Sequence, residues 1–359
     1  MLSANSLLGL LTPASLLRAP PGVAPRVFSP LSMPAPQSFI FHDPPKAPPG
    51  LERAVVAIGN FDGAHQGHAI VAGRAIALAR KLDRPAAALT FEPHPVDYFS
   101  KPGTVFRLSP ELARARALQR FGLDGMIVLR FDAAIANQSA EDFVREILVG
   151  RLNVSGVVVG YDFHFGKARA GSPAFLVDAG KRYGFEVDVV DKVIADAQGN
   201  PEAVHSNKAR AALEEGNVAE AARLLGHHWF IVGEVIHGQK LGRTLGFPTA
   251  NIALDPSCRL RHGIYAVRFS VDGATYDGVA NFGSRPTVTN DGAPLLEVFV
   301  FDFSGDLYGR IAEVSFIGWI RGEAKFDSLE ALVEEMNRDK AKAREILAPG
   351  KLSSSLPTS

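Results

Sequence analysis

The spacing of apolar residues changes once along this chain of 359 residues, near residue 226. Before that point, short apolar runs alternate with stretches in which apolar residues recur at helical spacing. This order predicts a parallel β-sheet with helices on both faces. After it, apolar and polar residues alternate within successive runs that turn residues separate, which predicts an antiparallel barrel or sandwich. The chain is therefore expected to form two domains of different classes.

The expected elements follow from these two patterns. In the first domain, strands are expected at 54–58, 86–91, 125–131, 156–161 and 185–190, and helices are expected from Gly67 and at 109–121, 139–151 and 173–183. In the second domain, strands are expected at 230–236, 263–271, 275–283, 295–303 and 311–320. Capping boxes are expected at Asn217 with Glu220 and at Asp327 with Glu330, the second opening a last helix with an apolar stripe of Leu329, Leu332, Val333 and Met336.

Residues 1–50 are rich in proline and contain no acidic residue before Asp43. This composition predicts a disordered extension, or a start codon placed too early with Met33 as the true start. An organelle transit sequence is the alternative, although the expected basic amphipathic helix is missing. The two domains are then expected at 51–226 and 227–348, and 349–359 is expected to be a flexible tail.

Composition narrows the class of ligand and the compartment. Lys plus Arg and Asp plus Glu both amount to 38, so small phosphorylated ligands are favoured over nucleic acid. Cys258 is the only cysteine, which excludes an internal disulfide and a thiolate-rich metal site and favours a reducing, cytoplasmic compartment. No apolar run reaches the ~18 residues that a membrane helix needs, so no membrane partner is expected.

The run GNFDGAHQGH, from Gly59 to His68, follows the first predicted strand and leads into the first predicted helix. Backbone N–H groups and the helix dipole favour an anion at such a place, and His65 and His68 add two imidazoles on the same side. An isolated HxxH pair usually only caps a surface helix. The preceding strand-Gly-x-Phe-Asp-Gly context favours a phosphate site instead.

The run GQKLGRTLGFPTAN, from Gly238 to Asn251, lies in the second domain. Glycines at 238, 242 and 246 permit a loop whose backbone N–H groups wrap phosphates, and Thr249 and Asn251 offer hard oxygen ligands for Mg²⁺. A Walker loop is excluded, because Arg243 stands where lysine should and no βαβ unit surrounds the run. Two phosphate sites in one chain predict two reactions.

Glu297 is the best candidate for acid–base chemistry in the second domain. In the run LLEVFVFDF it shares a strand face with Phe299, Phe301 and Phe303, where an unpaired carboxylate would be costly. Spacing alone leaves two explanations open, a structural ion pair with an arginine or a catalytic carboxylate. Asp302 falls on the other face and is a poorer candidate.

The first motif, together with FEPHP at 91–95 and VVGYDFHFGKARAG at 158–171, resembles the FMN adenylyltransferase module of bacterial bifunctional riboflavin kinase/FMN adenylyltransferases. The resemblance implies a Rossmann-like nucleotidylyltransferase domain in which His65 and His68 stabilise the ATP phosphates while the FMN phosphate attacks the α-phosphorus. It implies ATP contacts at Gly59, Phe61, Asp62 and Gly63, and flavin contacts at His94, Pro95, Asp162, Phe163 and Phe165.

That family has a further phosphate-binding element, ISSTxIR, where this chain reads VHSNKAR at 204–210. Ser206 and Arg210 match, whereas His205 and Asn207 replace a serine and a threonine. Altered rather than abolished phosphate binding is therefore expected from Ser206, Asn207 and Arg210. A role of Ser206 as a simple helix N-cap is an equal alternative.

The second motif resembles the GR-x-LG[FY]-PTAN signature of riboflavin kinase, and the likeness continues through NFGSRPT (281–287), DLYG (306–309) and RGEAKF (321–326). It implies a barrel in which Glu297 is the general base and in which Arg321 and Phe326 help to hold the flavin. It also implies that Mg-ATP binds through Gly238, Gly242, Arg243, Gly246, Pro248, Thr249 and Asn251.

The expected function is FMN formation from riboflavin and ATP in the second domain, and FAD formation from FMN and ATP with release of pyrophosphate in the first. Because of His205 and Asn207, the alternative is a kinase whose first domain has become a flavin-binding or assembly module. No KMSKS-like loop is present, which argues against a class I aminoacyl-tRNA synthetase. Mixed charges on the strands argue against a nucleic-acid-binding barrel. The sequence leaves the oligomeric state open.

Overall fold

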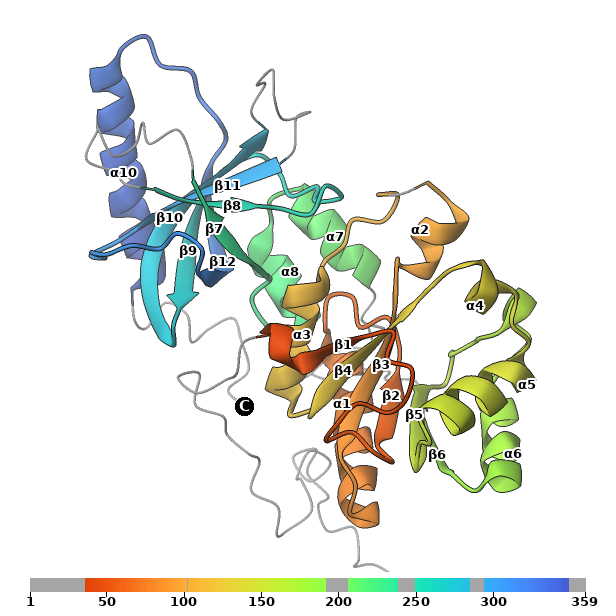
Figure 1. The fold of residues 1–359 in the computed structure, drawn as a ribbon. Coiled ribbons are helices and arrows are strands. Elements are labelled where there is room, and N and C mark those ends of the chain that lie inside the picture. The colour runs from red at the N-terminus through yellow and green to blue at the C-terminus, as the bar shows by residue number, and fades with distance from the viewer. Residues whose placement is uncertain (1–35, 102, 192–205, 238–248, 285–293, 349–359) are drawn as a thin grey trace, which may run out of the picture.

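The computed structural model describes residues 36–101, 103–191, 206–237, 249–284 and 294–348. The chain forms an α/β half and a β-barrel half, and two helices lie between them (Figure 1). Both predicted fold classes are confirmed, and the second is a barrel rather than a sandwich. None of the helices in the described ranges is long and apolar enough to cross a membrane.

Six parallel strands form the sheet of the α/β half in the order β1-β4-β3-β2-β5-β6. The chain moves from β2 to β3 and β4 on one side, and then returns to place β5 and β6 on the other side of β2. Sheets of this kind bind ligands at the carboxyl ends of the strands, beside such a reversal. The strands are β1 (Ile40–His42), β2 (Val55–Ile58), β3 (Ala86–Glu92), β4 (Gly125–Arg130), β5 (Gly156–Gly160) and β6 (Glu186–Val190).

Helices cover both faces of this sheet, as predicted. α1 (Gln66–Leu82) and α3 (Glu111–Phe121) pack against the strand side chains of one face of the sheet. The π-helix η4 (Phe143–Arg151), which continues from α5 (Ala140–Asp142), and α6 (Pro173–Tyr183) pack against the strand side chains of the other face. Two short helices, α2 (Pro95–Phe99) and α4 (Ala133–Asn137), follow β3 and β4, and the 3-10 turn η5 (Lys167–Arg169) follows β5.

The expectation that residues 1–50 lie outside the core is wrong for residues 36–50. The 3-10 turn η3 (Pro36–Phe39) packs against α3, and β1 then adds to the sheet beside β4. Phe39 is only 5% exposed. The strand has three residues and prolines on both sides, so the pattern predicted disorder. Residues 1–35 lie outside the described residues, and the boundaries at 51, 227 and 349 remain predictions.

A closed antiparallel barrel forms the second half, in the order β10-β11-β8-β7-β12-β9. Five of its strands match the predicted runs. The sixth, β8, lies at the end of the GQKLGRTLGFPTAN motif, where loop residues hid the strand pattern. The strands are β7 (Phe230–Ile236), β8 (Thr249–Ala253), β9 (Gly263–Val271), β10 (Ala274–Ser284), β11 (Pro294–Val300) and β12 (Ile311–Arg321).

The last helix, α10 (Leu329–Leu347), packs on the outside of the barrel. Its N-cap is Ser328, whose hydroxyl oxygen accepts a hydrogen bond from the backbone N–H of Ala331 at 3.1 Å, so the expected cap at Asp327 is wrong by one residue. The expected apolar stripe is wrong at Leu329, which is 59% exposed, whereas Leu332, Val333 and Met336 are partly buried. The fully buried positions of the helix are Asp339, Ala343 and Leu347.

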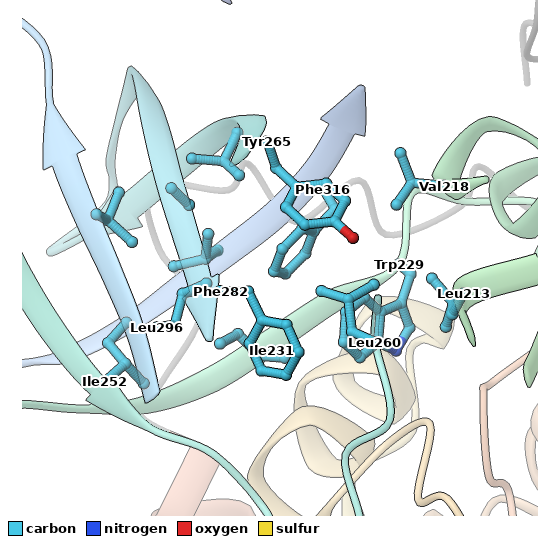
Figure 2. Packing of buried hydrophobic residues seen from close by; sticks show 14 of the residues in the cluster. Leu213, Val218, Trp229, Ile231, Ile252, Leu260, Tyr265, Phe282, Leu296 and Phe316 are labelled. Atoms are coloured by element: carbon cyan, nitrogen blue, oxygen red, sulfur yellow. The ribbon is translucent and has the colours of Figure 1, made fainter. Parts of the chain in front are cut away.

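The two halves share one hydrophobic core, to which the α/β half contributes Phe106 and Leu108. Figure 2 shows another part of this core, where helices α7 (Ser206–Glu214) and α8 (Val218–Leu225) contribute Leu213 and Val218, and the barrel contributes Trp229 and Phe316. The indole N–H of Trp229 donates to the carbonyl oxygen of Leu108, in the α/β half, at 2.7 Å. The predicted cap of α8 at Asn217 is confirmed, because its side chain accepts from the backbone N–H of Glu220 at 3.1 Å.

Candidate active sites

A cavity of about 1490 Å³ lies at the carboxyl ends of β2, β3, β5 and β6, where the sheet topology predicts a ligand. Three motifs that are far apart in sequence meet there, and the first turn of α7 joins them. The predicted residues that line it are Gly59, Phe61, Asp62, His65, His68, His94, Pro95, Asp162, Phe163, Phe165, Ser206, Asn207 and Arg210.

Gly63 does not line this cavity, although it belongs to the first motif. Its φ is +83°, and a Cβ atom there would lie 2.9 Å from Cδ1 of Leu108. Its N–H donates to the hydroxyl of Ser109 at 3.2 Å. Gly63 therefore shapes the turn by its backbone, since few other residues adopt this conformation at low cost.

The two histidines of the motif stack at the start of α1. His65 is the N-cap residue, and its ring lies 3.8 Å from that of His68, with an angle of 18° between the planes. Burial lowers the pKa of His68 well below its ordinary value, and the nearby His65 lowers it further. His68 is therefore neutral near pH 7, and it offers a phosphate one N–H donor rather than a positive charge.

Asp62 links the motif to α7. Its carboxylate accepts from the backbone N–H of Ser109 at 2.8 Å and from Nη2 of Arg210 at 2.5 Å. The hydroxyl of Ser206 donates to the Asp62 carbonyl oxygen at 3.0 Å, which is not an N-cap bond. Nη1 of Arg210 also donates to Oδ1 of Asn207 at 2.7 Å. The replacement of threonine by Asn207 therefore gives this arginine an acceptor within its own helix turn.

A buried charge cluster behind the cavity was not predicted. Both terminal nitrogens of Arg107 donate to the carboxylate of Glu92, at 2.7 and 2.8 Å, and Nη2 of Arg114 donates to it at 2.6 Å. Nη1 of Arg114 is 3.3 Å from the carbonyl oxygen of Asn60. The cluster thus joins FEPHP to GNFDG. Its only sequence signal is an acidic residue inside an otherwise apolar strand end.

The predicted flavin residues also line this cavity. His94 caps α2, and its Nδ1 accepts from the backbone N–H of Val96 at 3.2 Å. Burial lowers the pKa of His94. The rings of Phe163 and Phe165 are nearly parallel, with centroids 5.6 Å apart. The two phenylalanines give the cavity the apolar surface that a planar ring system needs, and Asp162 lines the cavity beside them.

On the barrel, Glu297 in β11 lies between two asparagines. Asn251 in β8 is its direct neighbour on one side, and Asn281 in β10 is its neighbour on the other. Leu296 and Val298 point into the core, so Glu297 and both asparagines share the outer face. Oδ1 of Asn251 is buried, and no described residue donates a hydrogen bond to it. An amide oxygen in that state suits a cation.

The predicted neighbours of Glu297 are only partly right. Phe299 and Phe301 pack in the cluster beneath α10, but β11 ends at Val300, and Phe303 packs against the shared core instead. Asp302, with φ +54°, is exposed and lies 2.9 Å from Nη2 of Arg344. A structural ion pair therefore accounts for Asp302.

Arg321 and Phe326 lie where β12 leads into α10. The guanidinium of Arg321 is 5.8 Å from the Phe326 ring centre and donates to the Asp339 carboxylate at 2.9 and 2.6 Å. Thr249 begins β8, opposite Phe299. The remaining predicted phosphate residues, Gly238, Gly242, Arg243, Gly246 and Pro248, lie outside the described residues.

Comparisons with known proteins agree with this division into two sites. Residues 48–202 match the FAD synthetase family model, and residues 225–347 match the riboflavin kinase model. Proteins from Pseudomonas fluorescens and Escherichia coli (strain K12), both described as bifunctional riboflavin kinase/FMN adenylyltransferase, are 42% and 38% identical; each comparison covers 82% of this chain and 93% of the relative. A crystal structure described as a macrolide-efflux protein from Streptococcus pneumoniae is 30% identical, with a TM-score of 0.70, over 85% of this chain and 99% of that one.

Proposed function

Since this chain belongs to the family of bifunctional riboflavin kinase/FMN adenylyltransferases, we propose that it carries out both reactions, each at its own site. The barrel phosphorylates riboflavin with ATP to give FMN. The α/β half joins FMN to the AMP part of a second ATP, which gives FAD and pyrophosphate. The substrates are riboflavin, FMN and ATP.

The main support for adenylyl transfer is the cavity at the strand ends, because it gathers a phosphate site and an aromatic wall within one space. An oxygen of the FMN phosphate attacks the α-phosphorus of ATP, and the bond to the leaving pyrophosphate breaks. No covalent enzyme intermediate is needed. The start of α1, the neutral His68 and the Arg210 guanidinium stabilise the charge that develops on the phosphates.

The outer face around Glu297 supports phosphoryl transfer on the barrel. The Glu297 carboxylate accepts the proton of the terminal ribityl hydroxyl, and the oxygen of that hydroxyl attacks the γ-phosphorus of ATP. The bond from the γ-phosphorus to the bridging oxygen breaks, and ADP leaves. Thr249 and Asn251 lie on the same face and would hold Mg²⁺ through oxygen atoms. The ion would neutralise charge on the phosphates.

A time course of products tests the proposal. Purified protein is incubated with riboflavin and Mg-ATP, and flavins are separated by chromatography; FMN should appear first and FAD later. With FMN as the substrate, FAD should form directly. If FMN accumulates without FAD in the first experiment and no FAD forms from FMN in the second, the kinase-only alternative is supported.

Glu297→Gln separates the two sites. This nearly isosteric change should abolish FMN formation and leave the conversion of FMN to FAD intact. Asp302→Asn is the matched control, because this exposed carboxylate follows the same strand and pairs with Arg344. Both activities should survive in the control. Loss of FAD formation in a folded Glu297→Gln protein would contradict separate sites.

A further inference from the structure

We propose that Arg259, which belongs to the barrel, binds a phosphate-bearing substrate in the cavity of the α/β half. The inference rests on the proposed adenylyl transfer. It adds a residue from the kinase half to the wall of the other site. Arg259 lies between β8 and β9, outside every motif of the adenylyltransferase resemblance.

The segment that carries Arg259 is fixed on both sides of this residue, against the α/β half before it and against α7 after it. The Ser257 hydroxyl accepts from the backbone N–H of Arg107 at 3.0 Å. Leu260 is 2% exposed and belongs to the shared core. The N–H of Arg261 donates to the carbonyl oxygen of Leu213 at 3.0 Å. Arg259 is therefore held at the cavity by its neighbours in sequence.

The guanidinium of Arg259 reaches residues that line the cavity. Its Nη2 donates to the carbonyl oxygen of Thr104 at 2.6 Å, and its Nε is 3.7 Å from Oε1 of Glu214. Thr104, Glu214 and Arg259 all line the cavity. The Arg259 side chain is 48% exposed, so part of it remains accessible to a ligand.

Helix α7 connects this place to the phosphate motif. Ser206, Arg210 and Glu214 line the cavity from three successive turns, and eight residues of helix span about 12 Å. Arg259 therefore stands at the end of the wall that begins beside His65 and His68. A substrate with several phosphates, or a phosphate joined to a ring system, is long enough to meet both places.

The charge of the cavity gives Arg259 a specific role. Among the described residues that line it, four are Lys or Arg and four are Asp or Glu, so the lining is formally neutral apart from its histidines. Loss of Arg259 would leave one excess negative charge facing anionic substrates. FMN and ATP both carry phosphates, and both would be repelled.

The test is the steady-state kinetics of FAD formation from FMN and Mg-ATP by the full-length protein. Arg259→Gln should raise the KM for FMN, for ATP or for both by about three- to tenfold, with kcat changed less than about twofold, because the lost contact favours substrate binding. The rise should shrink at high salt. Arg259→Lys keeps the charge and should retain most of the affinity, whereas Glu214→Gln removes a carboxylate and should lower the same KM.

Arg261→Gln is the matched control. Arg261 lies on the same segment, but its guanidinium stacks 4.6 Å from the Trp319 ring and it does not line the cavity. The control should leave the KM values unchanged, and the KM for riboflavin in FMN formation should not change in any variant. The KM that rises identifies the substrate.

Unchanged KM values in Arg259→Gln, or an equal rise in Arg261→Gln, would overturn the proposal. If Arg259→Gln does not fold, the opposite sign expected for Glu214→Gln still decides it, because a purely structural pair would not lower the KM. Absence of FAD formation by the unmodified protein would instead refute the proposed function itself.

Discussion

The substitution Glu92→Gln removes the carboxylate that two buried arginines share. Arg107 and Arg114 are 8% and 1% exposed in their side chains, and Glu92 is 31% exposed. Glutamine keeps the size of the side chain but offers one neutral acceptor to two guanidinium groups. We expect a large loss of stability in the α/β half, because the arginines then stay buried without a counter-charge.

The pKa of Glu92 gives the magnitude. Burial alone would raise it, but the hydrogen bond from Arg107 and the charges of Arg114 and Arg107 outweigh burial and lower the pKa from 4.5 to about 2. One pKa unit corresponds to about 1.36 kcal/mol of free energy. The lowering of the Glu92 pKa, reduced for solvent screening at the exposed part of the side chain, therefore contributes roughly 2–3 kcal/mol to the free energy of unfolding at neutral pH.

The sign of the pH dependence follows from the same shift. A carboxylate whose pKa is lower in the folded protein stabilises the fold fully above its unfolded pKa, near 4.5, and stops doing so as the pH falls to about 2. The difference in unfolding free energy between the unmodified protein and Glu92→Gln should therefore be constant above about pH 5. Below that value it should shrink steadily.

Urea unfolding followed by far-UV circular dichroism measures this difference. Trp229 and Trp319 are the only tryptophans, so fluorescence follows the barrel together with the core that it shares with the α/β half. Glu141→Gln is the matched control. Hydrogen bonds from Arg182 and Tyr183 also lower the pKa of Glu141 to about 2, but the pair lies at the surface, where an ion pair contributes little.

Equal destabilisation by the two substitutions would refute the reasoning, because burial is the feature that separates them. The reasoning would also be refuted if the difference in unfolding free energy between the unmodified protein and Glu92→Gln stayed unchanged down to about pH 3. The ionised carboxylate would then not be the source of the stability.

Two further predictions concern the turn at Gly63 and helix α7. Gly63→Ala should destabilise the protein by roughly 1–2 kcal/mol and slow FAD formation more than FMN formation, because φ is +83° at this position; thermal unfolding and both activity assays measure this. Asn207→Thr removes the amide oxygen that accepts from Arg210, which leaves an N–H for phosphate, so the KM for ATP in FAD formation should fall about two- to fivefold, as initial rates would show.

The period of the apolar pattern predicted most of the fold, because burial of one face fixes the spacing in both helices and strands. The pattern failed where an element is too short to show a period, or where glycines, prolines or a charged residue interrupt the apolar spacing. β1 has three residues between prolines, and β8 follows a motif with glycines at 238, 242 and 246. At α10 the apolar pattern missed Asp339, a charged residue that is buried on the helix and pairs with Arg321.

The candidate site in the α/β half was predicted from motifs, since motif residues must meet at the carboxyl ends of parallel strands. Residues that act from outside the motifs gave no such signal. Arg107 and Arg114 reach Glu92 across 15 and 22 residues. Arg259 comes from the other half of the chain. Its hydrogen-bond partner is the backbone oxygen of Thr104, and a sequence pattern does not predict contacts with backbone atoms.

The segment 106–109 explains why the two sites are not structurally independent, although their chemistry is separate. Ser109 holds the turn at Asp62 and Gly63 by two hydrogen bonds. Its N–H donates to the Asp62 carboxylate, and its hydroxyl accepts from the N–H of Gly63. One residue earlier, the carbonyl oxygen of Leu108 accepts from Trp229 of the barrel. The packing of the barrel therefore reaches the turn that precedes His65 and His68 through one short segment. We therefore expect a substitution that loosens Trp229 to slow FAD formation, which the chromatographic assay with FMN and Mg-ATP would measure.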